Sequence, residues 1–296
     1  MVIKLTDGLQ LIFGENTGGF PYSNSLLITG ETRALVDAGA GVNILKDIAE
    51  QGIETLILSH FHPDHGRDAY LFKDSQRWVH IGDAPAVADR RRYKEFRNYQ
   101  LPGNEGLMAI EEASPLGKYP HSPVARAFTD GEELDFGKGA RVTVVHTPGH
   151  TAGHCCFYEV DREILYAADV DAGPFGPWYG DEVSDIDDFI HSVDKIIELR
   201  PKLLVPGHGK PVTENIMEKL TKYIRVIDRR EDDIIQFLAE KPSSLDDLVG
   251  QGLIYRRMPA PGEIFRLFEK GMLQKHLQRL LRFKEVTVDG DLYYTC

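Results

Sequence analysis

The chain has 296 residues, of which 42% are hydrophobic and 27% are charged, a composition typical of globular proteins. No apolar run approaches the roughly 20 residues of a membrane-spanning helix, so we expect no contact with a membrane. The three cysteines are too few for a disulfide framework, and the N-terminal residues lack the apolar stretch of a signal peptide. These features predict a cytoplasmic protein.

The formal net charge of −12 is uneven along the chain. Residues 1–213 hold 20 Lys and Arg against 32 Asp and Glu, whereas residues 214–296 hold 14 of each. Because an acidic surface repels phosphate backbones, we do not expect non-specific binding of nucleic acid. A small molecule is the expected substrate, and the composition is compatible with a homo-oligomer.

Turn residues and short apolar stretches predict a strand-rich domain over residues 1–213. Two strands flank Asp7-Gly8, and a glycine-rich loop follows over 14–24. Residues 82–130, which contain the basic run Arg90–Arg92, look like an insertion. The other expected elements are a hairpin of 25–29 with 34–36, helices over 42–50 and 185–200, and strands over 55–59, 141–145, 155–160, 164–167 and 203–205.

Residues 214–296 predict a smaller, mostly helical C-terminal domain. Helical patterns cover 214–240, 243–249 and 263–284, with Gly271 expected to divide the last helix, and 285–295 predicts a hairpin. Three helices followed by a hairpin resemble a winged helix, which could insert Arg279 and Arg282 into a DNA groove. The neutral charge of this region instead favours a helix packed on the core with a solvated charged face.

Histidines gather in the segment His60-Phe61-His62-Pro63-Asp64-His65, directly after a predicted strand. Three of the 11 histidines of the chain fall within these six positions, together with an aspartate. Imidazole nitrogens and carboxylate oxygens are ligands that suit zinc and other first-row divalent metals. The segment therefore predicts a metal site.

Three further candidate ligands also follow predicted strands. They are His150 in Thr147-Pro148-Gly149-His150, Asp169 after the strand over 164–167, and His208 in Pro206-Gly207-His208-Gly209. Strands that end at one edge of a sheet bring their loops together. We therefore expect these side chains to meet the histidine segment in one site.

The motifs HFHPDH, TPGHTAGH, AAD and PGHG resemble, in this order, the motifs of the metallo-β-lactamase superfamily over about residues 1–213. The resemblance implies an α/β fold, a four-layer αββα sandwich with the site at one edge of its paired sheets. It also implies two divalent metal ions bridged by Asp169. The first ion would be held by His60, His62 and His150, and the second by Asp64, His65 and His208. Zinc is the expected metal, with iron or manganese as alternatives.

Two neighbouring divalent ions lower the pKa of a shared water and polarise a carbonyl or phosphoryl oxygen. The sequence thus predicts a hydrolase that uses an activated hydroxide, with Asp64 as a candidate to orient it or to accept a proton. Tyr179, in a loop rich in glycine, proline and aromatic residues, is a candidate hydrogen-bond donor to a developing oxyanion. A rigid, packed loop fits the same residues equally well.

Residues around the ligands have expected roles too. Asp37 is a candidate acceptor for the outer N–H of a ligand histidine, with a turn-capping role as the alternative. His154 and His146 are expected to be structural, and Asp181 is expected to lie on the surface.

The leading hypothesis is a hydrolase of a small ester, thioester or lactone, similar to the hydroxyacylglutathione hydrolases of the same superfamily. One alternative is a nuclease or phosphodiesterase of this superfamily, supported only by Arg90–Arg92 and the basic residues of the last helix. The other is a mononuclear iron sulfur dioxygenase that uses a subset of the same ligands. Both alternatives stay open at the level of the sequence.

Overall fold

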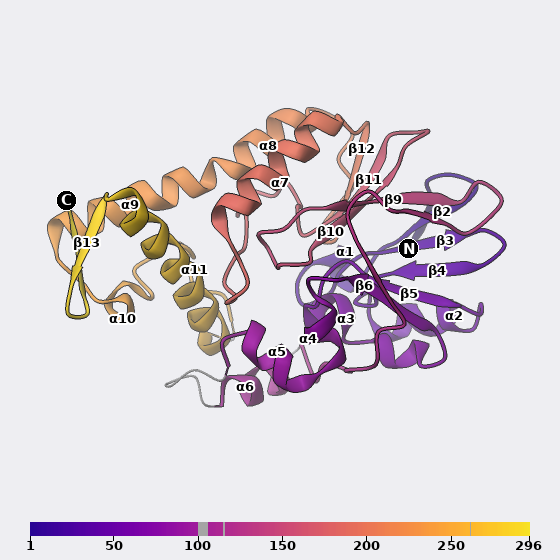
Figure 1. Ribbon diagram of the computed structural model, residues 1–296, viewed down its shortest axis with the longest axis horizontal. Helices are drawn as coiled ribbons and strands as arrows, with labels where there is room; N and C mark the ends of the chain where they lie inside the picture. Colours follow the sequence, from indigo (N-terminus) through magenta and orange to yellow (C-terminus); the bar gives the residue numbers. More distant parts are fainter. Residues whose placement is uncertain (100–105, 115, 261) are drawn as a thin grey trace.

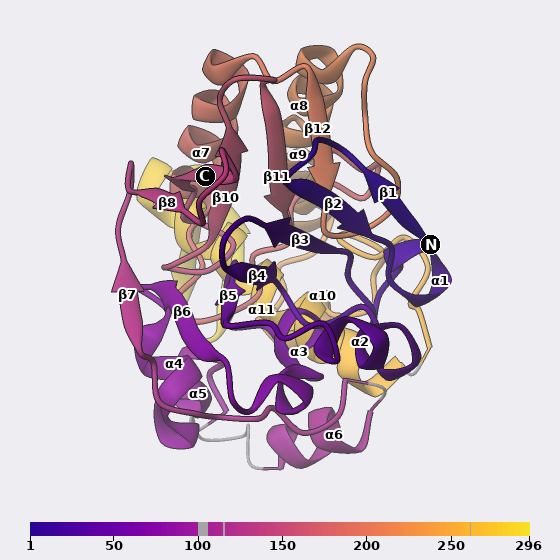
Figure 2. The ribbon, with the colours of Figure 1, turned by 90° about the vertical axis from the view of Figure 1, so that its right-hand side faces the viewer.

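The computed structural model describes residues 1–99, 106–114, 116–260 and 262–296. Two β-sheets form its centre (Figures 1 and 2). In spatial order, the first sheet contains β1 (Val2–Lys4), β2 (Leu9–Ile12), β3 (Ser25–Thr29), β4 (Arg33–Val36), β5 (Thr55–Leu58), β6 (Gln76–His80) and β7 (Arg126–Phe128). The second contains β12 (Leu203–Pro206), β11 (Ile164–Ala168), β10 (Cys155–Glu159), β9 (Arg141–His146) and β8 (Glu133–Asp135).

Strand direction brings several loops to the same edge of the sheets. Strands β4 to β7 run parallel in the first sheet, and β11 runs parallel to β12 in the second. Strand β9 points the same way as β11, because both pair antiparallel with β10. The segments that follow β9, β11 and β12 therefore leave the second sheet at one edge, where a site can form.

The inner faces of the two sheets bury a shared apolar layer. Leu11, Leu26 and Ile57 of the first sheet lie in one cluster with Val144 and Phe157 of the second, each at most 2% exposed. Burying such a side chain fully contributes about 1.5–3 kcal/mol to stability. This layer holds the two sheets face to face.

Helices cover the outer faces. On the first sheet, the buried side chains of α2 (Val42–Ala49) pack against the strand residues that point outward. On the second sheet, α7 (Ile186–Leu199) packs through Ile186, Phe189 and Val193, and Asp185 caps its N-terminus. Figure 2 shows α7 on one side of the paired sheets and α2 on the other. The four layers form the αββα sandwich that the resemblance implied.

Within residues 82–99, 106–114 and 116–130, the structure describes three helices and the edge strand β7 of the first sheet. The helices are α4 (Ala84–Ala88), α5 (Arg90–Phe96) and α6 (Leu107–Ala113). Residues 100–105 and 115 of the expected insertion lie outside the described residues. The basic run at the start of α5 makes ion pairs, because Arg90 contacts Glu112 and both Arg91 and Arg92 contact Glu95.

The C-terminal helices extend from beside α7 to one end of the molecule, where the expected final hairpin lies (Figure 1). These elements are α8 (Ile216–Ile224), α9 (Val226–Glu240), α10 (Leu245–Leu248), α11 (Gly262–Phe283), β13 (Val286–Asp289) and β14 (Leu292–Thr295). Leu220, Ile227 and Leu273 of these helices share one apolar cluster with Leu165 of the second sheet. Within the described residues, none of the helices has the length and apolarity that crossing a membrane requires.

Gly271 does not divide the last helix, because α11 is continuous from Gly262 to Phe283. A Cβ atom at Gly271 would lie 2.1 Å from the carbonyl oxygen of Gly180. The glycine is needed for this close approach between helix and loop, and tertiary packing outweighs its helix-breaking cost of about 1 kcal/mol. The expected break is therefore wrong.

Gly39 lies in the turn after β4 and packs closely against the short helix α3 (Pro63–Gly66). A substitution at Gly39 therefore tests how this helix is positioned. A Cβ atom at Gly39 would lie 1.6 Å from the carbonyl oxygen of Asp64, so Gly39→Ala must displace α3. We expect a loss of about 3 kcal/mol or more in the free energy of unfolding, measured by chemical denaturation.

Gly52→Ala is the matched control, since Gly52 has a φ of 76° but no heavy atom within 4 Å of the added Cβ. Backbone strain alone predicts a loss of about 1–2 kcal/mol there. Equal losses in the two variants would contradict the tight packing of Gly39 against α3.

Candidate metal centre

The candidate ligands all lie just beyond the ends of strands. His60 and His62 follow β5, and α3 then carries Asp64 and His65. The loops after β9, β11 and β12 bring in His150, Asp169 and His208. Residues that are up to 148 positions apart in the sequence thus gather at one edge of the two sheets.

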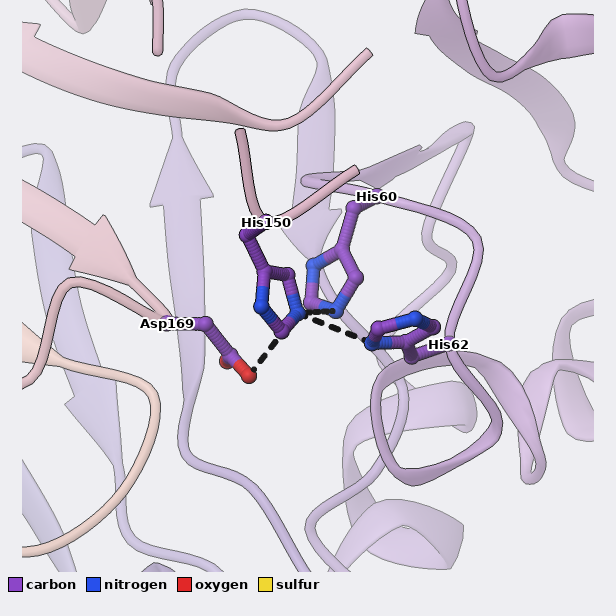
Figure 3. A group of neighbouring side chains, drawn as sticks. All are labelled: His60, His62, His150 and Asp169. Atoms are coloured by element: carbon purple, nitrogen blue, oxygen red, sulfur yellow. Dashed lines mark hydrogen bonds and ion pairs between the residues drawn. The ribbon is translucent and has the colours of Figure 1, made fainter. Parts of the chain in front are cut away.

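His60, His62, His150 and Asp169 form what we call the first group, in which one ligand atom from each residue lies within 4.8 Å of the others (Figure 3). His150 Nε2 lies 3.2 Å from His60 Nε2 and 2.8 Å from His62 Nδ1. Asp169 Oδ2 lies 3.2 Å from the same His150 nitrogen. Three imidazole nitrogens and one carboxylate oxygen therefore converge on one point.

Asp64, His65 and His208 form the second group, also with ligand atoms within 4.8 Å of one another. His208 Nε2 lies 3.4 Å from His65 Nε2 and 3.3 Å from Asp64 Oδ2. Asp169 Oδ1 lies 2.7 Å from His65 Nε2 and 3.5 Å from His208 Nε2. Asp169 thus contacts the first group with one oxygen and the second group with the other, which is the placement a bridging carboxylate needs.

The chemistry of these donors fits divalent cations. Burial lowers the pKa of His60 well below its usual range and that of His62 to about 4, so both rings are neutral near pH 7. Neutral imidazole nitrogens are the form that binds metal. Asp169 Oδ1 is buried and accepts no hydrogen bond, although His65 lies close to it. His60 and His62 of the first group are therefore in the protonation state that binds a metal ion.

In the second group, contacts between histidine and carboxylate outweigh the effect of burial on the pKa values. Burial lowers the pKa of His208, whereas the nearby carboxylates of Asp169 and Asp64 raise this pKa to about 9. Burial likewise raises the pKa of Asp64, and contact with His208 lowers it to about 2. Asp64 is thus ionised at neutral pH, as a metal ligand must be.

Each ligand histidine uses its other ring nitrogen to contact a hydrogen-bond acceptor. Such outer hydrogen bonds fix the tautomer and the orientation of the ring. The pairs are His60 Nδ1 with Ser59 Oγ at 3.0 Å, His62 Nε2 with Asp181 Oδ2 at 2.6 Å, His65 Nδ1 with Asp37 Oδ2 at 2.8 Å, His150 Nδ1 with the Trp178 carbonyl at 2.8 Å, and His208 Nδ1 with the Gly18 carbonyl at 2.8 Å.

Asp37 lies in the outer position expected from the sequence. It accepts hydrogen bonds from His65 Nδ1 and from the Tyr166 hydroxyl, both at 2.8 Å. It also accepts from the Ser59 hydroxyl at 2.8 Å, and that hydroxyl contacts His60 Nδ1. One buried carboxylate therefore orients a ligand of each group.

Asp181 is not a surface residue, so that expectation is wrong. It is 3% exposed, contacts His62 Nε2, and pairs with Arg97 at 2.9 Å. Its sequence position carries no signal of this role, because 119 residues separate it from His62. Only the folded structure shows that it orients a ligand.

Tyr179 is fully buried, and its hydroxyl is engaged away from the metal groups. The hydroxyl accepts a hydrogen bond from Arg230 at 2.8 Å and contacts His276 Nε2 at 2.7 Å. This placement contradicts the expected role of Tyr179 as an oxyanion donor. His154 contacts a candidate ligand through the backbone, because its Nε2 accepts a hydrogen bond from the backbone N–H of Asp169 at 3.2 Å.

A pocket of about 480 Å³ opens onto both groups. Five of the ligands line it, namely His62, Asp64, His150, Asp169 and His208. Its apolar wall comes mainly from the 173–181 loop and the C-terminal region, and includes Phe175, Trp178, Tyr255, Ile264, Phe265 and Phe268. The C-terminal region thus forms part of the wall of this pocket.

Asp181 offers a direct test of the outer hydrogen bonds. Asp181→Ala removes the acceptor of His62 Nε2 and leaves Arg97 without that partner, so we expect zinc affinity to fall by about 10–100-fold. Competition with a chelating dye measures it. Asp74→Ala, at an exposed aspartate, is the control and should bind zinc like the wild type. Unchanged affinity in Asp181→Ala would refute the role of this carboxylate.

Comparison with known proteins agrees with the geometry. The family model of the metallo-beta-lactamase superfamily matches residues 18–208. The chain is 27% identical over 270 residues to a beta-lactamase-like protein 2 homolog of Drosophila melanogaster, covering 87% of this chain and 83% of that protein. It is 26% identical over 297 residues to an atrochrysone carboxyl ACP thioesterase of Aspergillus fumigatus, covering 93% and 81% respectively.

A solved structure shares the fold over the whole length. A metallo-beta-lactamase family protein from Thermus thermophilus matches with a TM-score of 0.76 and 22% identity, covering 99% of this chain and 100% of that chain. With the αββα sandwich and the two ligand groups at its edge, these matches lead to one conclusion. The chain belongs to the metallo-beta-lactamase superfamily and is one of its hydrolases.

Proposed function

We propose that this hydrolase uses two divalent metal ions, most simply zinc, to cleave an acyl thioester into a carboxylic acid and a thiol. The observation that carries the proposal is the pocket, in which the two ligand groups meet a wall of apolar and aromatic side chains. A polar reaction centre beside an apolar surface suits a substrate with a reactive carbonyl and an apolar acyl group.

The two ligand groups support a pair of ions rather than one. They offer seven ligand residues, which exceeds the four positions of one tetrahedral site, and Asp169 contacts both groups. A pair of divalent ions, when bound, supplies a water of lowered pKa and a Lewis acid for the substrate carbonyl. The same geometry argues against the sulfur dioxygenase alternative, which needs only a subset of these residues.

Asp64 has a role on the protein side of this chemistry. Its carboxylate lines the pocket and is ionised near pH 7. A carboxylate in this position can accept a hydrogen bond from the attacking water and hold it in line with the substrate carbonyl. The thiol product has a pKa near 8.5, so it departs more readily than an alcohol does.

The wall of the pocket favours an acyl group over a phosphodiester. Trp178 and Phe268 meet edge to face at 5.4 Å, and Phe265 packs beside Phe268 at 5.8 Å. Arg97 is the one Lys or Arg side chain among the described residues that line the pocket, and ion pairs with Asp181 and Glu111 occupy it. A phosphate backbone would find no unpaired cation among these side chains.

Two arginines near the C-terminal end of α11 are also engaged within the chain. Arg279 pairs with Asp187 at 2.7 Å and also contacts Glu231, and Arg282 pairs with Asp187 as well. We therefore propose that the C-terminal region serves the hydrolase and does not bind nucleic acid. A small molecule is the proposed substrate, and the thioesterase relative from Aspergillus fumigatus supports the thioester among the candidate bonds.

Metal analysis tests the number of ions. The wild-type chain should bind about two equivalents of zinc when zinc is in excess, and His208→Ala should lose one of them because the second group loses a ligand. His191→Ala is the control, since His191 is exposed on α7 and should keep both equivalents. A full metal load in His208→Ala would remove His208 from the site.

A substrate panel tests the reaction. Thioesters with apolar acyl groups should be cleaved faster than lactones of similar size, and a phosphodiester should not be cleaved. Asp169→Ala should lower kcat by on the order of 10²–10³-fold, the range seen when a charge-stabilising group is removed from an active site. Asp74→Ala should have no effect. Phosphodiester cleavage without thioester cleavage would refute the proposed function.

A further inference from the structure

The 173–181 loop supplies the outer acceptors for two histidines of the first group. The Trp178 carbonyl lies 2.8 Å from His150 Nδ1, and Asp181 Oδ2 lies 2.6 Å from His62 Nε2. The orientation of both rings therefore depends on where this loop lies. What holds the loop in place thus bears directly on metal binding.

Helices of the C-terminal region hold the loop on two sides. On the side of α9, a Cβ atom at Gly176 would lie 2.5 Å from Val226 Cβ. On the side of α11, a Cβ atom at Gly271 would lie 2.1 Å from the Gly180 carbonyl. The loop is enclosed between these helices at glycine contacts that leave no room for a side chain.

Arg230, one helical turn after Val226 on α9, makes the polar part of this contact. It is 1% exposed, and it donates to the carbonyls of Phe175 and Pro177, both at 2.7 Å, and to the Tyr179 hydroxyl at 2.8 Å. Its guanidinium carbon also lies 4.7 Å from the centre of the Phe175 ring. All of these contacts are with the 173–181 loop.

The charge of Arg230 makes these hydrogen bonds important. A buried guanidinium is costly unless it is hydrogen-bonded or paired. Among the described residues, no carboxylate forms an ion pair with Arg230, so the loop acceptors are what compensates its burial. The hydroxyl of Tyr179 extends the contact to α11, where it meets His276 Nε2 at 2.7 Å.

We propose that Arg230 is a positioning residue for the first group. It fixes the 173–181 loop, and the loop in turn orients His150 through the Trp178 carbonyl and His62 through Asp181. The C-terminal region then helps to build the metal site as well as the wall of the pocket. The inference rests on the proposed metal binding and is independent of the thioester substrate.

Zinc affinity measured for each group separately tests the proposal. A His208→Ala background reports mainly on the first group, and a His150→Ala background reports on the second. Adding Arg230→Gln should weaken zinc binding by about 10–100-fold in the first background and by less than about threefold in the second. Arg230→Lys should also weaken the first group, because lysine keeps the charge but not the forked geometry.

Arg229→Gln is the matched control, since Arg229 is exposed at the neighbouring position of α9 and should leave both affinities unchanged. Circular dichroism and thermal unfolding establish that each variant is folded. Equal losses in both backgrounds, or unchanged affinity in the first, would overturn the proposal. So would failure of both Arg230 variants to fold, which would make Arg230 a residue of core stability. Absence of zinc binding in the wild type would overturn the metal proposal together with this one.

Discussion

The structure depends on the convergence of imidazole nitrogens and carboxylate oxygens in one buried volume. His150 Nε2 lies 3.2 Å from His60 Nε2 and 2.8 Å from His62 Nδ1. Asp169 Oδ1 is buried without a hydrogen bond and lies 2.7 Å from His65 Nε2. Polar groups buried in this way are costly without a compensating partner. Two divalent cations, as proposed above, would provide that compensation if Asp169 bridges them. The sandwich can therefore be understood as a scaffold that holds these donors together against their own repulsion.

The scaffold acts through successive layers of contact. Parallel strands bring the ligand loops to one edge, and the outer acceptors Asp37 and Asp181 then fix the ligand rings. The C-terminal helices complete the arrangement, because they hold the 173–181 loop and supply part of the pocket wall. The region that lines the proposed acyl-binding surface is thus the same region that we propose to position the first group, which would link substrate binding to metal binding.

Most of the candidate ligands could be predicted from the sequence, because they lie in segments that follow short apolar strands, and strand ends meet at one edge. The roles of Asp181, Tyr179 and Gly271 could not. Asp181 meets His62 across 119 residues, and Gly271 is fixed by a contact with Gly180 on a different element. Local sequence patterns indicate where strands and turns lie, whereas contacts between distant residues depend on how separate elements pack. For that reason the helix-breaking tendency of Gly271 predicted a break that is absent from α11, and the polarity of Asp181 predicted an exposed side chain that is in fact buried.

The proposed function requires that a water molecule activated in this site cleaves the substrate. The most direct measurement is turnover of an apolar acyl thioester in ¹⁸O-labelled water under anaerobic conditions, with mass analysis of both products. We expect turnover to persist without oxygen gas, the carboxylic acid to carry one ¹⁸O atom from water, and the thiol to be released unoxidised. A strict requirement for molecular oxygen, with label entering the product only from that gas, would contradict hydrolysis.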